Sequence, residues 1–115
     1  MKKLSIFKIL NLDLQRLFNP SGDINGSNKV NVLKAFHPRF APVILIRLSY
    51  FFYQISLFRI FSHLLTWLNI FIFGIESTPR CKIGSGLVIP HSSGIVLGAL
   101  SIGKNATIFQ GVTLG

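Results

Sequence analysis

The sequence predicts an α+β protein in which apolar α-helices are followed by the first coils of a parallel β-helix. Two patterns carry this prediction: an almost wholly apolar stretch from Ala41 to Phe73, and aliphatic residues that recur about every sixth position after Ile83. An α-helix would need apolar residues every three or four positions and a simple strand at every second one, so the period of six fits neither. We therefore divide the chain into an N-terminal helical region, residues 1–74, and the start of a hexapeptide-repeat β-helix, residues 75–115.

The N-terminal residues predict a helix from about Leu4 to Phe18 that ends at Asn19-Pro20. Its apolar face has helical spacing and consists of Leu4, Phe7, Leu10, Leu14 and Leu17. Residues 21–28 have the composition of a loop, and residues 30–36 predict a short helix closed by His37-Pro38. A lone histidine before proline is expected at the surface or as a capping residue.

The apolar stretch predicts two amphipathic helices, at about residues 42–56 and 57–72, that form a hairpin. Each carries one polar stripe at helical spacing, which consists of Arg47, Tyr50 and Gln54 in the first and of Arg59, Ser62, His63 and Thr66 in the second. The charge-free runs are shorter than the roughly 20 residues of a membrane span. We expect core helices first, helices in the membrane interface second and spanning helices third. His63 is expected to be a hydrogen-bonded helix residue.

The aliphatics at Ile83, Ile89, Ile95, Ile102, Ile108 and Leu114 are spaced by six, six, seven, six and six positions. Small residues follow three of them directly, at Gly84, Gly103 and Gly115. This period is typical of a parallel β-helix built from hexapeptide repeats. The aliphatic side chain fills the axis of the coil, and the small residue is expected to permit the tight turn.

Composition narrows the classes of partner. The 115 residues suffice for one small domain and carry a net charge of +9, which suits a polyanion, an anionic membrane surface or an anionic cofactor. The basic residues are scattered and form no nucleic-acid motif, so we predict no nucleic-acid binding. The single Cys81 favours a reducing compartment and is expected to be a packed or surface thiol. No histidine, cysteine or acid falls at metal-ligand spacing, so we predict no metal site.

One residue of the repeat region is chemically distinct from its neighbours. His91 lies in the run GLVIPHSSGIVLGALSIGKNATIFQGVTLG, which extends from Gly86 to Gly115. This run resembles the serine O-acetyltransferase branch of the hexapeptide-repeat acyltransferases. That branch carries a histidine, two small residues and Gly-Ile-Val here, and then Ile-Gly-x-Asn and Gln-x-Val-Thr-Leu-Gly. The lead-in from Ile75 to Gly84 resembles that branch as well, with Glu76 three residues before Pro79.

The resemblance implies a left-handed parallel β-helix and an acyltransferase that moves an acetyl group from acetyl-CoA to serine, in cytoplasmic cysteine biosynthesis. It implies His91 as the catalytic general base and Glu76 as the acid that pairs with it. Such a pair suits the reaction, because an alcohol must lose its proton as the ester bond forms. It also implies a trimer-based homo-oligomer, and it assigns no residue of this chain to the coenzyme A site.

Two departures from the pattern of that branch leave the identity of the acceptor open. Pro90 stands where many members have an acid, and Gly98-Ala99-Leu100-Ser101 lacks the acid of their Gly-Glu-Thr-Ala. The alternatives are a sugar hydroxyl of a polysaccharide as acceptor, or an inactive remnant that associates with a membrane or with intact subunits. Fewer than two coils of about 18 residues lie between Ile83 and Gly115. We therefore expect a truncated chain that alone does not bind acetyl-CoA measurably.

Overall fold

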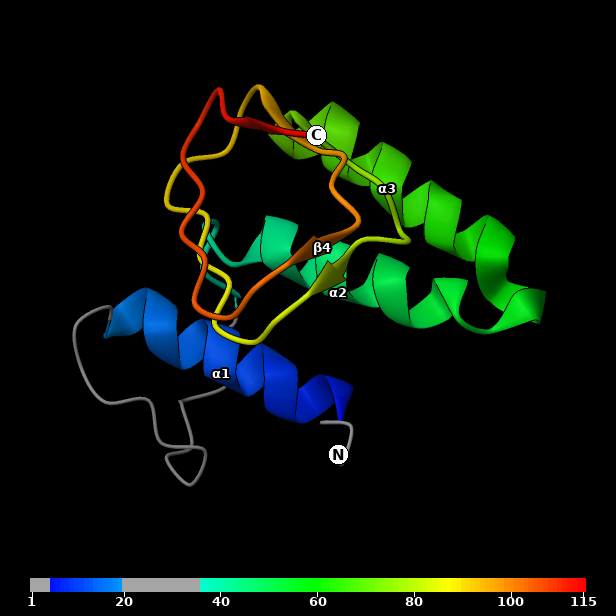
Figure 1. The fold of residues 1–115 in the computed structure, drawn as a ribbon, viewed down its shortest axis with the longest axis horizontal. Coiled ribbons are helices and arrows are strands. Elements are labelled where there is room, and N and C mark those ends of the chain that lie inside the picture. Colours follow the sequence, from blue (N-terminus) through cyan, green and yellow to red (C-terminus); the bar gives the residue numbers. More distant parts are fainter. Residues whose placement is uncertain (1–4, 20–35) are drawn as a thin grey trace.

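The computed structural model describes residues 5–19 and 36–115 (Figure 1). Helices α1 (Ile6–Phe18), α2 (Ala41–Tyr53) and α3 (Arg59–Phe73) come first, with a short 3-10 helix, η2 (Ser56–Phe58), between the last two. Five short strands follow, which are β1 (Ile75–Ser77), β2 (Lys82–Ile83), β3 (Ile95–Leu97), β4 (Ser101–Ile102) and β5 (Thr113–Leu114). The α+β prediction is confirmed. The predicted loop at 21–28 and nearly all of the predicted helix at 30–36 lie outside the described residues.

Local sequence explains the helix ends. The Ser5 hydroxyl accepts a hydrogen bond from the Lys8 amide at 3.2 Å and so caps α1. Gly74 ends α3 in the left-handed conformation, at a φ of 70°, which glycine adopts without a steric penalty. On α1, Leu14 is buried, and Leu10 and Leu17 pack partly against the core. Phe7 is 80% exposed, so the predicted apolar face meets the core only in its later turns.

The strands stack as a parallel coil with three sides. One sheet has the order β1-β3-β5, a second pairs β2 with β4, and Val88 forms a single parallel bridge with Thr107. Each strand thus lies beside the strand two further along the chain, and Figure 1 shows the resulting loop almost end-on. Most of the periodic aliphatics point inward as predicted: Ile83, Ile89, Ile95 and Ile108 are buried, whereas Ile102 and Leu114 are partly buried.

The glycines after the aliphatics do not all have the expected role. A side chain at Gly84 would place its Cβ 2.7 Å from the amide nitrogen of Lys104 on the next winding. Gly84 is therefore required by close approach of two windings rather than by an unusual turn conformation. A Cβ at Gly103 or Gly115 would meet nothing within 4 Å.

The helix hairpin has polar residues inside and apolar residues outside. Between α2 and α3, the Ser62 hydroxyl donates to the Ser49 carbonyl at 2.6 Å and the Asn69 amide donates to the Pro42 carbonyl at 3.2 Å. The opposite face of α3 leaves Ile60, Trp67 and other large apolar side chains in solvent. The segment Ser56–Phe73 is apolar enough to cross a membrane by length and composition alone, and only 22% of it is buried. The first expectation, a core helix, is therefore wrong for α3, because only one narrow face of it is buried, which consists of Ser62, Leu65, Thr66 and Asn69.

A buried carboxylate joins the helices to the coil. Asp13 on α1 is fully buried and accepts hydrogen bonds from Arg47 Nε at 2.7 Å and Arg47 Nη2 at 2.9 Å. Its Oδ1 also accepts from the amides of Gly86 and Leu87, both at 2.8 Å. Burial raises the pKa of Asp13, and the Arg47 guanidinium and the two amides oppose that rise.

Arg47 completes this junction from α2. It donates through Nη1 to the Ile83 carbonyl at 2.6 Å and through Nη2 to the Gly84 carbonyl at 2.7 Å. Arg16 on α1 adds bonds to the carbonyls of Gly86 and Ala106, at 2.9 and 3.1 Å. The backbone around residues 83–87 is thus held by side chains of both helices.

We predict that Gly84→Ala destabilises the fold by roughly 1–3 kcal/mol, because the new methyl group would overlap the backbone of Gly103 and Lys104. Gly103→Ala is the matched control and is expected to change stability by less than about 0.5 kcal/mol. Chemical denaturation of the three proteins measures the difference. Equal midpoints for both variants would show that the two windings are not in such close contact.

We predict that Asp13→Asn lowers the free energy of unfolding by about 3–5 kcal/mol, because it leaves the Arg47 guanidinium buried without a counter-charge. Glu76→Gln removes a charge from an exposed acid and is the matched control, with an expected change within about 0.5 kcal/mol. Thermal unfolding followed by circular dichroism is the measurement. Similar melting temperatures for the two variants would contradict the structural role of the ion pair.

Candidate functional site

His91 lies at the corner of the coil that precedes β3, and its side chain is exposed. Two residues with positive φ form this corner, Ser93 at 94° and Gly94 at 70°. The Gly94 amide donates to the Gly74 carbonyl at 2.9 Å, and the Gly111 amide donates to the Ser93 carbonyl at 3.0 Å. Windings on both sides therefore fix the backbone that presents His91. A non-glycine residue at such a φ costs free energy, as is common at functional corners.

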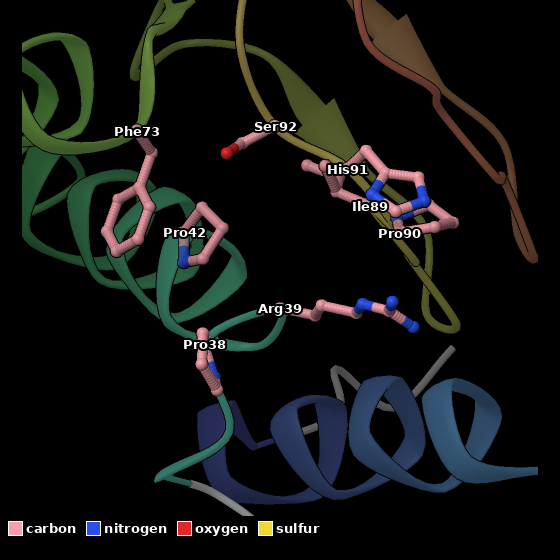
Figure 2. Close-up of a pocket in the computed structure, with 8 residues that line it drawn as sticks. All are labelled: Pro38, Arg39, Pro42, Phe73, Ile89, Pro90, His91 and Ser92. Carbon is pink, nitrogen blue, oxygen red and sulfur yellow. The ribbon is translucent and has the colours of Figure 1, made fainter.

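A pocket of about 320 Å³ lies beside His91, between the coil and the helices (Figure 2). The start of α2 and the end of α3 provide one wall, which consists of Pro38, Arg39, Pro42 and Phe73. The coil provides the other wall, which consists of Ile89, Pro90, His91 and Ser92. The pocket is open to solvent on one side, and its lining combines apolar side chains with the polar groups of Arg39, His91 and Ser92.

Glu76 lies in the middle of β1, exposed, with Val96 of β3 as its neighbour in the sheet. Within the described part of the chain, it forms no hydrogen bond or ion pair with His91, nor one with Arg80 or Lys82. The two segments that carry Glu76 and His91 do meet: the Cβ position of Gly74 lies 3.1 Å from Ser93 Cα. Glu76 follows Gly74 by two residues and His91 precedes Ser93 by two, so along the parallel windings the two residues lie on opposite sides of this contact.

Arg39 is the functional candidate that sequence reasoning missed. Figure 2 shows its side chain running from the start of α2 toward the side of the pocket on which the His91 ring lies. Its backbone amide donates to Nδ1 of His37 at 3.1 Å, and the His37 carbonyl accepts from the amides at the start of α2. The His37 ring thus stabilises the turn before α2, but it does not cap the helix, whose N-cap residue is Phe40. No local pattern marks Arg39, because its position in the pocket depends on how α2 packs on the coil.

The remaining candidates lie away from this pocket. Cys81 is 3% exposed, and burial raises the pKa of its thiol, so it is a packed residue rather than a nucleophile. His63 is exposed, and its ring lies edge-on to Tyr53 with the centroids 6.0 Å apart. Its side chain forms no hydrogen bond within residues 5–19 and 36–115, which differs from the prediction, because the exposed ring contacts the Tyr53 ring of α2 instead of a polar partner.

The curated proteins to which this chain is similar in sequence are serine acetyltransferases. A serine acetyltransferase of Synechococcus elongatus is 33% identical over 111 residues, which span 96% of this chain and 44% of that protein. A serine acetyltransferase of Helicobacter pylori is 48% identical over 59 residues, half of this chain and 34% of that protein. This chain is a homologue of the serine acetyltransferases. It spans less than half the length of these relatives, and no family model matches it.

Solved structures of serine acetyltransferases have the same fold. The Neisseria gonorrhoeae enzyme superposes with a TM-score of 0.75 at 23% identity, over 95% of this chain and 41% of that one. A serine acetyltransferase in complex with CoA gives a TM-score of 0.76 at 22% identity, over 96% of this chain and 46% of that one. The arrangement of helices and parallel strands in this chain is therefore that of these solved structures.

Proposed function

We propose that the chain supplies the helical region and the first coils of an O-acetyltransferase that uses acetyl-CoA as acetyl donor. The observation that carries this proposal is the homology to serine acetyltransferases over 96% of the chain, together with an exposed histidine in a pocket of the repeat region. A related structure contains CoA, which supports the donor. We further propose that the parallel coil is left-handed, as the sequence resemblance implies, and that copies assemble into a trimer-based homo-oligomer.

In this proposal His91 is the general base and Glu76 its partner. The base takes the proton of the acceptor hydroxyl as the hydroxyl oxygen attacks the acetyl carbonyl. The C–S bond of the thioester then breaks, and the imidazolium returns the proton to the departing CoA thiolate. Acetyl-CoA supplies an acetyl group that is already activated, so the chain needs no nucleophile of its own. The exposure of His91 leaves its ring accessible to an acceptor in the pocket. In this proposal the Glu76 carboxylate orients the imidazole and stabilises the imidazolium that forms when His91 takes the proton.

The acceptor is serine or a sugar hydroxyl. A related structure is a complex with serine, which supports the first and would place the reaction in cytoplasmic cysteine biosynthesis. Among the described residues, no acid lines the pocket to meet an amino group, and Pro90 precedes His91. This absence favours the second acceptor, a sugar in polysaccharide biosynthesis.

A second candidate function is contact with a membrane surface through α3. Its outer face exposes Ile60 at 79%, Phe71 at 76% and Trp67 at 61%. Arg59 at the start of α3 and Arg80 and Lys82 beyond its end are exposed, and the chain carries a net charge of +9. An apolar helix face beside basic residues is suited to an anionic bilayer surface. The chain would then be a cytoplasmic protein that touches the membrane, whether or not it is catalytically active.

We predict that His91→Ala lowers the rate of thiol release from acetyl-CoA by about 10²–10⁴-fold, as expected for loss of a general base. The assay uses the 115-residue chain and a form continued by the downstream reading frame, each with serine and with sugar acceptors. Activity is expected in the longer form only. His63→Ala, on the exposed surface of α3, is the control and should retain activity. Full activity of His91→Ala would reject the assigned base, and no release by either form would favour the inactive remnant.

We predict that the fluorescence of Trp67, the only tryptophan, shifts to shorter wavelength when vesicles of anionic lipid are added. Phe71→Lys should abolish the shift. Leu100→Lys alters an apolar residue on the coil that is even more exposed than Phe71, and it should leave the shift unchanged. A shift that depends on protein concentration without vesicles would instead show that a second copy of the chain covers this face.

A further inference from the structure

The pocket beside His91 contains one permanently charged side chain, Arg39. Among the residues that line the pocket, no other carries a fixed charge and none is acidic. The Arg39 side chain is exposed, and its guanidinium forms no hydrogen bond or ion pair within the described part of the chain. The pocket is therefore positively charged by a group whose donors are all available.

Three other arginines already use their guanidinium groups in hydrogen bonds within the fold. Arg47 is bonded to Asp13 and to two carbonyls, and Arg16 bonds the carbonyls of Gly86 and Ala106. Arg59 donates to the Tyr53 carbonyl at 3.2 Å and lies over the Tyr53 ring, 4.9 Å from its centroid. The Arg39 guanidinium differs from these three because it forms no such contact among the described residues, so a structural role does not explain its presence in the pocket.

A guanidinium has five N–H donors in a planar fork that matches carboxylate and phosphate oxygens. Pro42, Phe73 and Ile89 line the same pocket, so an acceptor whose anionic group bonds to Arg39 can place its carbon skeleton against apolar side chains. A volume of about 320 Å³ lies at the lower end of the range for small-molecule sites, which suits a single sugar or a small hydroxy acid.

We propose that Arg39 binds an anionic group, a carboxylate or a phosphate, of the acceptor and thereby positions the acceptor hydroxyl at His91. This inference rests on the proposed acetyl transfer and narrows its acceptor to hydroxyl compounds that carry anionic oxygens. An acidic sugar, a sugar phosphate and a hydroxy acid meet this requirement. A neutral sugar does not, and an acceptor that offers only an ammonium group would be repelled.

The test is ligand binding to the 115-residue chain, followed through the ring resonances of His91 by NMR. The probes are glucuronate, glucose 1-phosphate, serine and glucose, so that the carboxylate and phosphate sources are separated. We expect at least one anionic probe to shift His91 and glucose to have no effect. Arg39→Gln should weaken that binding at least about tenfold, the usual effect of losing a charge-assisted hydrogen bond. Arg80→Gln removes an exposed arginine outside the pocket and should leave it unchanged.

The inference is overturned if Arg39→Gln binds the anions as wild type does, if Arg80→Gln weakens them equally, or if no anion shifts His91. Kinetics of the longer form separate this result from the proposed function. Arg39→Gln should raise KM for the anionic acceptor with little change in kcat, as expected for loss of a contact that holds the acceptor equally in the ground and transition states. Anion binding without acetyl transfer would reject the proposed function and leave the Arg39 site intact. Acetyl transfer by the longer form with an unchanged KM in Arg39→Gln would support the proposed function and reject the Arg39 site.

Discussion

The ion pair between Asp13 and Arg47 is the interaction on which the rest of the structure depends. Its carboxylate is fully buried and accepts four N–H groups, two from Arg47 and two from the backbone of the coil. A buried charge that lost these partners would destabilise the fold strongly. The pair therefore ties α1, α2 and the first corner of the coil into one unit. The hydrophobic core also joins the helices to the coil, since one cluster contains Leu14 and Val43 from the helices and Ile75 and Ile95 from the coil.

The candidate site is a consequence of this junction. Its pocket has walls from α2, α3 and the coil, so it exists only while the helices stay in place against residues 83–89. The coil presents His91 at a corner fixed from both sides, and α2 contributes Arg39. Neither part forms the site alone. This explains why a short piece of repeat can carry a shaped pocket although the coil has few windings.

The sequence predicted the elements whose signal is local and periodic. The aliphatics from Ile83 onward revealed the coil, and the helix limits of α1, α2 and α3 agree with prediction to within a few residues. Features that depend on packing were missed. No local pattern marked Asp13 as the buried partner of Arg47, and the stripe predicted on α3 did not show that Ser62 and Thr66 would be buried against α2. The catalytic pairing of Glu76 with His91 rests on resemblance and stays a prediction.

The most direct test of this account is native-state hydrogen exchange at the amides of Gly86 and Leu87, which lie at a corner rather than in a strand. Because both donate to the buried Asp13 carboxylate, the account predicts protection as strong as that of Val88 and Ile108, whose amides bond to neighbouring windings at 3.0 and 2.9 Å. Rapid exchange at Gly86 and Leu87, with Val88 and Ile108 still protected, would show that the helices are not locked to the coil and would contradict the account.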